Sequence, residues 1–150
     1  MSAPTLLRAE ELPVGTPIEL GAYTVTRDEI VEFARAWDPQ DFHVDEEVAA
    51  AGRFGGLIAS GIQTLGVYQR LAVLGALRHW DVVAGRTLRE IQLPAPVRPG
   101  MTLHGVLVVE EVAPTRPDMA LVTQRGTLTA DGRLRMELVC ETYVRRLHAG

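Results

Sequence analysis

The pattern of apolar and polar positions predicts different structures for the two halves of the chain. Residues 17–25 predict a first strand, and Thr26 opens a helix that runs to Trp37. Thr26 and Glu29 have the spacing of a capping box, in which each side chain satisfies a free backbone N–H at the helix start. The apolar side chains of this helix share one face: Ile30, Phe33, Ala34 and Trp37. Pro39 ends the helix, because a proline pushes the residue before it out of helical geometry.

Two further helices are predicted in the front half. Asp45 is placed to cap a short helix that ends at Ala51, before Gly52. A glycine-rich loop follows, and Ser60 begins a long helix that reaches about His79. Apolar residues cover more than one stripe of this long helix: Ile62, Leu65, Tyr68, Leu71, Val73, Leu74 and Leu77. A helix that is apolar around most of its circumference is usually buried, so we expect it inside the fold.

From Gly85 onward the pattern is almost purely that of strands. The predicted strands are residues 87–97, 102–112, 120–129 and 134–144. A Pro-rich loop, residues 114–117, follows the second of them, and Asp131-Gly132 joins the last two as a hairpin, because both turn positions favour positive φ. Hairpin-linked strands form an antiparallel sheet. One long buried helix with such a sheet predicts an α+β domain, with the helix packed on one face of the sheet.

Length, composition and charge limit the classes of function. The 150 residues, 47% of them hydrophobic, fit one domain with an N-terminal extension (1–14) and a tail (147–150). A net charge of −4 without any basic block argues against nucleic acid or an anionic membrane as a partner. Residues 1–12 do not resemble a signal peptide, and polar side chains interrupt the most apolar stretch, residues 58–77. Since Cys140 is the single cysteine, we expect no internal disulfide and a cytoplasmic protein.

The segment after the first helix holds a carboxylate and an imidazole. Asp38 and His43 lie five residues apart, across a loop that Pro39 constrains. A bend there could aim both side chains at one water molecule. One group could then take a proton from the water while the other delivers a proton to a neighbouring carbon, which is acid–base catalysis of addition or elimination. An Asp-Pro pair at a helix end is also common turn chemistry, and His43 could simply bond to the backbone.

The glycine-rich approach to the long helix, residues 54–61, is a second candidate feature. Free N–H groups at a helix start can bind negative charge. If Gly61 lies in the first turn, its N–H could polarise a thioester carbonyl and stabilise the enolate-like charge that forms when water adds to a conjugated double bond. The same glycines also suit a tight turn and close helix packing, so this motif alone leaves both interpretations open.

Together, these segments resemble the MaoC-like acyl dehydratases, which include the (R)-specific enoyl-CoA hydratases. Residues 38–45 read Asp-Pro-Gln-Asp-Phe-His-Val-Asp, similar to the family patterns Asp-x-Asn-Pro-(Leu/Ile)-His and Asp-Pro-Gln-Pro-Phe-His. Residues 54–61 read Phe-Gly-Gly-Leu-Ile-Ala-Ser-Gly and precede Thr64, similar to Phe-Gly-x-(Pro/Leu)-Ile-Ala-(His/Ser)-Gly. The turn at residues 96–100, Pro-Val-Arg-Pro-Gly, is also similar to the family.

This resemblance implies a hot-dog fold, in which an antiparallel sheet wraps a long central helix. It also implies a homodimer or a dimer of dimers, with an acyl tunnel near the subunit boundary. Asp38 and His43 match the family's catalytic pair, and Gly61 matches the glycine whose N–H faces the thioester oxygen. The implied reaction is the reversible syn addition of water to a trans-2-enoyl thioester, which would make the chain a lyase of fatty acid metabolism. Coenzyme A or phosphopantetheine enters as part of the substrate, and we expect no other cofactor.

Several further residues are candidates for contact with the acyl thioester: Phe42, Phe54, Gly56, Ile58, Ser60, Arg53 and Arg98. The two arginines could contact phosphate groups, although ordinary surface charge explains them as well. Ser60 also fits the role of a helix cap. Because His79, His104 and His148 show no metal-ligand spacing, we expect no metal site. Cys140 lies in a strand pattern and is interpreted as a core residue.

The chain departs from the family patterns at three positions. Trp37 and Gln40 stand where the hydratases have glycine and asparagine, and Asp41 stands where both branches have proline. Asp41 would free the loop backbone and add a negative charge near His43, which favours the protonated imidazole, unless its side chain faces solvent.

The sequence therefore predicts a hydratase or dehydratase of enoyl and 3-hydroxyacyl thioesters. Two alternatives share the fold. One is a non-catalytic acyl-binding subunit of a heteromeric dehydratase. The departures from the family pattern at Trp37 and Asp41 favour this alternative. The other is an acyl-CoA thioesterase.

Overall fold

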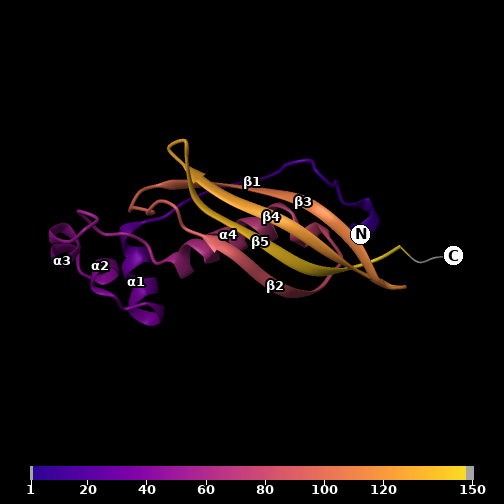
Figure 1. The fold of residues 1–150 in the computed structure, drawn as a ribbon, viewed down its shortest axis with the longest axis horizontal. Coiled ribbons are helices and arrows are strands. Elements are labelled where there is room, and N and C mark those ends of the chain that lie inside the picture. The colour runs from indigo at the N-terminus through magenta and orange to yellow at the C-terminus, as the bar shows by residue number, and fades with distance from the viewer. Residues whose placement is uncertain (1, 148–150) are drawn as a thin grey trace.

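The chain folds as one curved sheet around a central helix, α4 (Gly61–Gly75), in a computed structural model that describes residues 2–147. Five antiparallel strands lie in the order β1-β3-β4-β5-β2 (Figure 1). The strands are β1 (Ile18–Thr24), β2 (Val82–Gln92), β3 (Thr102–Arg116), β4 (Met119–Ala130) and β5 (Arg133–Arg145). This arrangement confirms the predicted α+β hot-dog fold. Of the predicted tail, residues 148–150, with His148, lie outside the described residues.

Three shorter helices gather at one end of the sheet (left in Figure 1). They are α1 (Arg27–Trp37), α2 (Asp41–Val44) and α3 (Glu46–Ala51). The predicted capping box is present, because Thr26 accepts a hydrogen bond from the Glu29 N–H and the Glu29 carboxylate accepts one from the Thr26 N–H. Asp45 caps α3, as predicted, by accepting from the N–H groups of Glu47 and Val48. The single turn of α2 was not predicted.

The end of α4 and both ends of β2 differ from the pattern-based prediction. Helix α4 ends at Gly75 rather than near His79, and a short 3-10 turn, Leu77–His79, follows it. A Cβ at position 75 would lie 2.8 Å from the Cα of Leu20, so the helix end packs directly on the backbone of β1. Strand β2 begins at Val82 and ends at Gln92, five residues before the predicted limits at both ends.

The predicted Pro-rich loop, residues 114–117, is largely strand, because β3 continues to Arg116. Pro114 pairs with Ala120 of β4. On the other side of β3, the pairing with β1 ends at Leu107. A proline has no N–H to donate to a neighbouring strand. Pro114 is tolerated in β3 because, at this position, β3 has a described neighbour on one side only.

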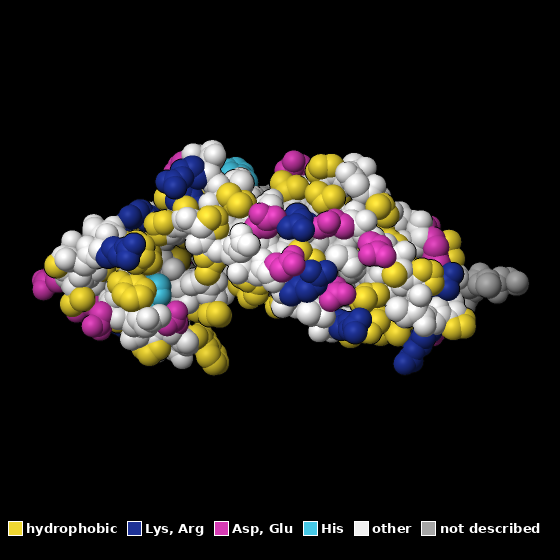
Figure 2. Space-filling view, in the orientation of Figure 1, with side chains coloured by type: hydrophobic (Ala, Val, Ile, Leu, Met, Phe, Trp, Pro, Cys, Tyr) yellow, Lys and Arg dark blue, Asp and Glu magenta, His cyan; other side chains and the backbone are white. Residues whose placement is uncertain are grey.

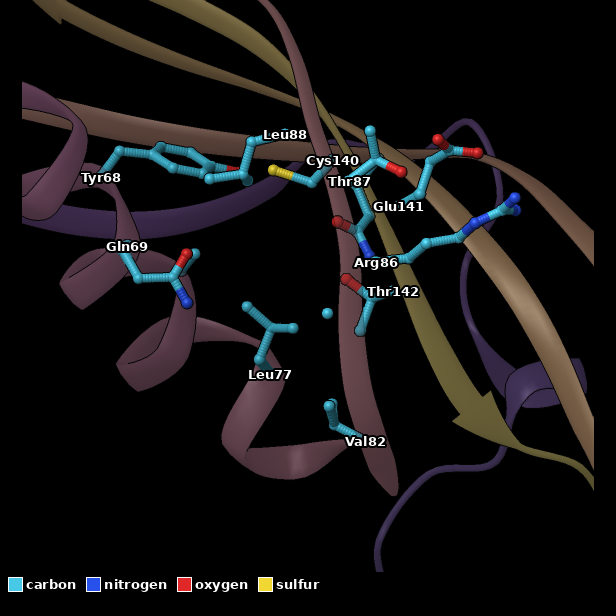
Figure 3. A pocket seen from close by; sticks show the side chains of 13 residues that line it. Tyr68, Gln69, Leu77, Val82, Arg86, Thr87, Leu88, Cys140, Glu141 and Thr142 are labelled. Carbon is cyan, nitrogen blue, oxygen red and sulfur yellow. The ribbon is translucent and has the colours of Figure 1, made fainter.

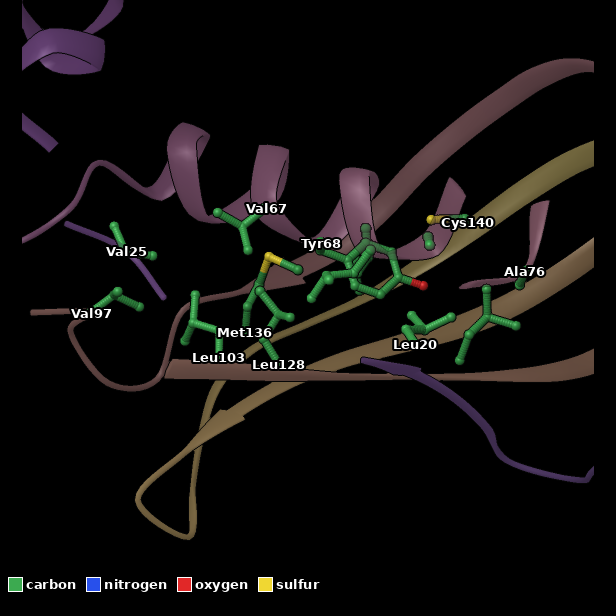
Figure 4. Close-up of a cluster of buried hydrophobic side chains, with 14 of the residues drawn as sticks. Leu20, Val25, Val67, Tyr68, Ala76, Val97, Leu103, Leu128, Met136 and Cys140 are labelled. Carbon is green, nitrogen blue, oxygen red and sulfur yellow. The ribbon is translucent and has the colours of Figure 1, made fainter. Parts of the chain in front are cut away.

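The two faces of the sheet differ in polarity. Alternate residues of β4 are buried, and inward side chains such as Leu128 share one core cluster with Tyr68 of α4 (Figure 4). The outward face carries charged pairs across neighbouring strands (Figure 2), among them Arg125 between Glu110 and Glu137. At the predicted hairpin, Asp131 and Gly132 have φ values of 51° and 71°. The turn prediction is therefore confirmed.

The chain covers only part of α4. Tyr68, Leu71 and Ala72 are buried, but Ile62, Val73 and Leu74 are exposed. The prediction of burial around most of the helix was therefore wrong for one side of it. Within residues 2–147, no helix combines the length and the apolar character needed to cross a bilayer. The N-terminal extension contributes to the core, because Ala9 and Leu12 are buried.

The ring of Tyr68 fits against the sheet because the facing residue of β4 is a glycine. A Cβ built at Gly126 would lie 2.1 Å from the Cζ atom of Tyr68, so the ring occupies the space where any side chain would begin. The ring is nearly completely buried between α4 and the sheet. Helix and sheet approach as closely as they do because position 126 has no side chain.

We predict that Gly126→Ala lowers the free energy of unfolding by about 1–3 kcal/mol, the usual cost of forcing an extra carbon into a packed core. Gly66→Ala is the matched control, because Gly66 lies within α4 and a Cβ there meets no atom within 4 Å. This control should gain about 0.5–1 kcal/mol from helix propensity. Urea unfolding followed by circular dichroism measures both changes. Equal stability of the two variants would contradict the close packing at Gly126.

Candidate active site

Asp38 lies at the C-terminal end of α1, and both of its carboxylate oxygens accept hydrogen bonds. The Ser60 hydroxyl donates to Oδ2 at 2.7 Å, and the Gln40 amide donates to Oδ1 at 2.7 Å. The bond from Ser60 above all, then the bond from Gln40 and the nearby imidazole of His43, hold the pKa of Asp38 below its ordinary value. Asp38 is therefore a carboxylate at neutral pH.

His43 lies on the single turn of α2 and is 4% exposed. Its Nδ1 is 2.6 Å from the carbonyl oxygen of Ile58. Because a carbonyl can only accept, Nδ1 carries the proton in this bond. Nε2 is then the atom available for proton transfer, and it lies 3.4 Å from Oδ2 of Asp38. The ring of Phe42 packs edge-on against the imidazole, with centroids 4.4 Å apart.

This arrangement brings two proton acceptors to one point. In the neutral imidazole with Nδ1 protonated, Nε2 presents a lone pair, and Oδ2 of Asp38 presents its own. A water molecule that donates to either acceptor would be activated for attack. The backbone bond expected if His43 were purely structural is present, but it uses Nδ1 and leaves Nε2 directed toward Asp38.

Gly61 is the first residue of α4, where backbone N–H groups have no acceptor within the helix. Ser60 caps this helix, as predicted, by accepting from the Ile62 N–H at 3.2 Å. A Cβ at position 61 would lie 2.4 Å from Cδ1 of Leu93. Only glycine fits between the helix start and the Leu93 side chain in this conformation.

A pocket of about 250 Å³ joins His43 to the start of α4. Four of the predicted site residues line it: His43, Phe54, Ile58 and Gly61. The opposite wall was not predicted, and it consists of residues 93–97, after β2, and the side chain of Arg135 on β5. The turn motif at residues 96–100 was the only sequence signal close to this wall. Nothing in the local pattern marked Arg135.

The remaining predicted site residues lie around the pocket rather than on its described lining. Arg98 donates from Nη2 to the carbonyl oxygen of Phe54 at 2.7 Å, so it braces the glycine-rich loop. Gly56 lies close to this arginine, and Arg53 is exposed. Of the family departures, Trp37 is 75% exposed and Asp41 is exposed at the start of α2.

A second pocket, of about 380 Å³, lies farther along the same face of α4, between the helix and strands β2 and β5 (Figure 3). Its wall includes Tyr68, Gln69 and Ala72 of the helix and Cys140 of β5. Burial raises the pKa of the Cys140 thiol to about 11, so the thiolate form is scarce at neutral pH. This fits the prediction that Cys140 is a core residue.

Comparison with known proteins places this geometry in a family. Residues 10–131 match the family described as "MaoC like domain". A Bacillus subtilis protein named "Uncharacterized protein YdeM" is 34% identical over 117 residues, which cover 78% of this chain and 83% of that protein. The 3-hydroxyacyl-thioester dehydratase Z of Mycobacterium tuberculosis is 32% identical over 124 residues, which cover 81% and 82%.

A solved structure agrees with these sequence matches. The crystal structure of the MaoC-like dehydratase from Rhodospirillum rubrum aligns with a TM-score of 0.85 at 34% identity. The alignment covers 94% of this chain and 98% of that chain. The fold, the sequence matches and the order of the motifs agree, and the chain belongs to the MaoC-like dehydratase family.

Proposed function

We propose that the chain catalyses the reversible hydration of an enoyl thioester to a 3-hydroxyacyl thioester. The observation that carries this proposal is the convergence of His43 Nε2 and Asp38 Oδ2, 3.4 Å apart, beside the free helix start at Gly61. The name of the Mycobacterium tuberculosis relative, a 3-hydroxyacyl-thioester dehydratase, supports the reaction class.

In the hydration direction, the Asp38–His43 pair removes a proton from a bound water as its oxygen attacks C3 of the enoyl group. Electrons move from the C2=C3 bond toward the thioester oxygen. The Gly61 N–H, with the positive end of the α4 dipole, stabilises the enolate-like charge on that oxygen. The pair then returns a proton to C2, and dehydration is the reverse path. The two groups act as one catalytic unit, because Nε2 and Oδ2 lie 3.4 Å apart.

The carrier of the acyl group, coenzyme A or phosphopantetheine, belongs to the substrate in this proposal, and the reaction uses no further cofactor. Cys140 is a free, buried thiol. A chain that keeps a free cysteine fits the reducing cytoplasm, where we place this activity within fatty acid metabolism.

We also propose that two copies of the chain associate through β2. This strand lies at one edge of the sheet, and most of its residues are exposed. Apolar side chains are exposed on β2 and on the uncovered side of α4: Val82, Val83, Leu88, Ile91, Ile62, Val73 and Leu74. An exposed edge strand can pair with a strand of another chain. Pairing of β2 with β2 of a second copy would cover the exposed apolar side chains of β2 and of α4.

The catalytic role of Asp38 and His43 can be tested by substitution. Asp38→Asn and His43→Gln should each lower kcat for hydration of crotonyl-CoA by about 10²–10⁴-fold, the range for loss of an acid–base group. Loss of the conjugated absorbance of the enoyl thioester measures the rate. Asp41→Asn is the matched control and should keep activity, because Asp41 is exposed. Unchanged activity in both pair variants refutes their role, and release of free thiol instead of hydration would indicate a thioesterase.

The pKa of Asp38 depends on the hydrogen bonds to its carboxylate. Ser60→Ala should raise it toward its ordinary value, because the largest stabilising hydrogen bond to the carboxylate is lost. Gln40→Ala should raise it less and leave the helix cap intact. NMR titration of the side-chain carboxyl carbon measures both shifts. An unchanged pKa in both variants would contradict the hydrogen-bond assignment.

The lowered pKa of Asp38 also determines how its contribution to stability depends on pH. Since the folded-state pKa of Asp38 lies below its unfolded value, its contribution to stability is present above the ordinary Asp pKa. That contribution is lost as the pH falls through the folded-state pKa. When the pH is lowered, protonation of Asp38 reduces the stability of the fold. This reduction should therefore be smaller in Ser60→Ala.

The proposed dimer should depend on the apolar edge of β2. Sedimentation velocity should find a dimer for the native chain and a monomer for the double variant Val83→Lys/Ile91→Lys, because lysines on an edge strand oppose pairing. Glu110→Lys, on the outer face of the sheet, is the charge-matched control and should stay dimeric. A native monomer at micromolar concentration would refute the association through β2.

A further inference from the structure

A buried arginine lines the pocket that holds His43. Arg135, near the start of β5, is 5% exposed and shares this pocket with His43 and Gly61. Its guanidinium bonds to backbone carbonyls. Nε and Nη2 donate to the carbonyl oxygen of Ala130 at 3.3 and 3.2 Å, and Nη1 donates to that of Pro96 at 2.8 Å.

Within residues 2–147, no carboxylate lies within ion-pair distance of Arg135. The contrast with Arg125 is informative, because that half-exposed arginine has two carboxylate partners, Glu110 and Glu137. Burial of a cation without an opposite charge is costly, since carbonyl dipoles replace only part of its hydration. A buried cation in the pocket that His43 lines therefore points to an anionic ligand group.

The guanidinium has donors left for such a group. It carries five N–H bonds, and the carbonyls of Ala130 and Pro96 use three of them. One N–H on each of Nη1 and Nη2 remains. Two N–H groups on neighbouring nitrogens match the two oxygens of a carboxylate.

The position of Arg135 indicates which part of the substrate carries the anion. In the proposed reaction the thioester oxygen occupies the helix start at Gly61, so Arg135 is available for a second negative group. The pocket that contains His43, Gly61 and Arg135 has a volume of only about 250 Å³. A group bound by Arg135 is then close to the reacting carbons, whereas the phosphates of coenzyme A lie at the far end of the pantetheine arm.

We propose that the acyl group of the substrate carries a carboxylate that Arg135 binds, so that the substrate is a monothioester of an unsaturated dicarboxylic acid. This inference rests on the proposed function. Water adds its hydroxyl to C3 and a proton to C2, one C=C π bond is lost, and the carboxylate stays unchanged on Arg135. The guanidinium orients the acyl group and takes no proton.

The test compares thioesters that differ in this one group. Fumaryl-CoA has a carboxylate in place of the terminal methyl of crotonyl-CoA, and glutaconyl-CoA places that carboxylate one methylene farther away. We expect the native chain to hydrate at least one carboxylated thioester with a kcat/KM about 10- to 100-fold above that for crotonyl-CoA, the strength of a charge-assisted contact. Arg135→Gln should remove this preference.

Ratios of kcat/KM between substrates cancel any loss of folded protein, so a destabilised variant still reports on selectivity. Arg135→Lys keeps the charge without the paired donors and should keep part of the preference. Arg133→Gln is the matched control, because it removes an exposed arginine from the same strand, and it should leave the preference intact.

The outcomes separate the two proposals. Efficient hydration of crotonyl-CoA without preference for either carboxylated thioester overturns the role of Arg135 and leaves the proposed function standing. No hydration of any of the three thioesters overturns both. An equal loss on all substrates in Arg135→Gln shows that Arg135 only clamps the loop at Pro96. A loss on crotonyl-CoA that is absent with crotonyl-N-acetylcysteamine, which has no phosphate, assigns Arg135 to the coenzyme instead.

Discussion

The hydroxyl group of Ser60 connects the central helix to the candidate catalytic carboxylate. Its oxygen accepts from the Ile62 N–H and so caps α4, and its hydrogen goes to Oδ2 of Asp38. One atom therefore fixes the start of the helix on which the sheet packs and the ionisation of the acid–base group. Two residues earlier, the carbonyl of Ile58 fixes the imidazole of His43 through Nδ1. The extended segment before α4 thus positions both reactive side chains.

These bonds also explain why a short and exposed loop can hold an ordered site. Asp38 is anchored by Gln40 within the loop and by Ser60 outside it. The family's proline is replaced by Asp41, which lies exposed at the start of α2. Here hydrogen bonds and the packing of Phe42 supply the constraint that a proline ring would otherwise provide.

Local signals in the sequence were sufficient for most of the helices, the hairpin and the fold class, although α2 was not predicted and α4 ends at Gly75 rather than near His79. Caps at Thr26, Asp45 and Ser60 act within a few residues, so their pattern is visible in the chain. The limits of β2 and β3 depend on which strands lie beside them, which no local window contains. For the same reason the sequence indicated Ser60 as a cap but not its bond to Asp38, 22 residues away. Arg135 was not predicted, because its distinguishing feature, the lack of a carboxylate partner within residues 2–147, is visible only in the folded chain.

Leu93 lies over Gly61 and directly follows β2, the strand at the sheet edge. A pairing strand on that edge would therefore act on the wall of the pocket as well as on the sheet. Thermodynamic linkage then requires the converse: a ligand that shifts this wall changes the affinity of the edge for its partner by the same factor. Occupancy of the pocket and self-association would then report the same coupling free energy, transmitted from the end of β2 through Leu93, the next residue in the chain.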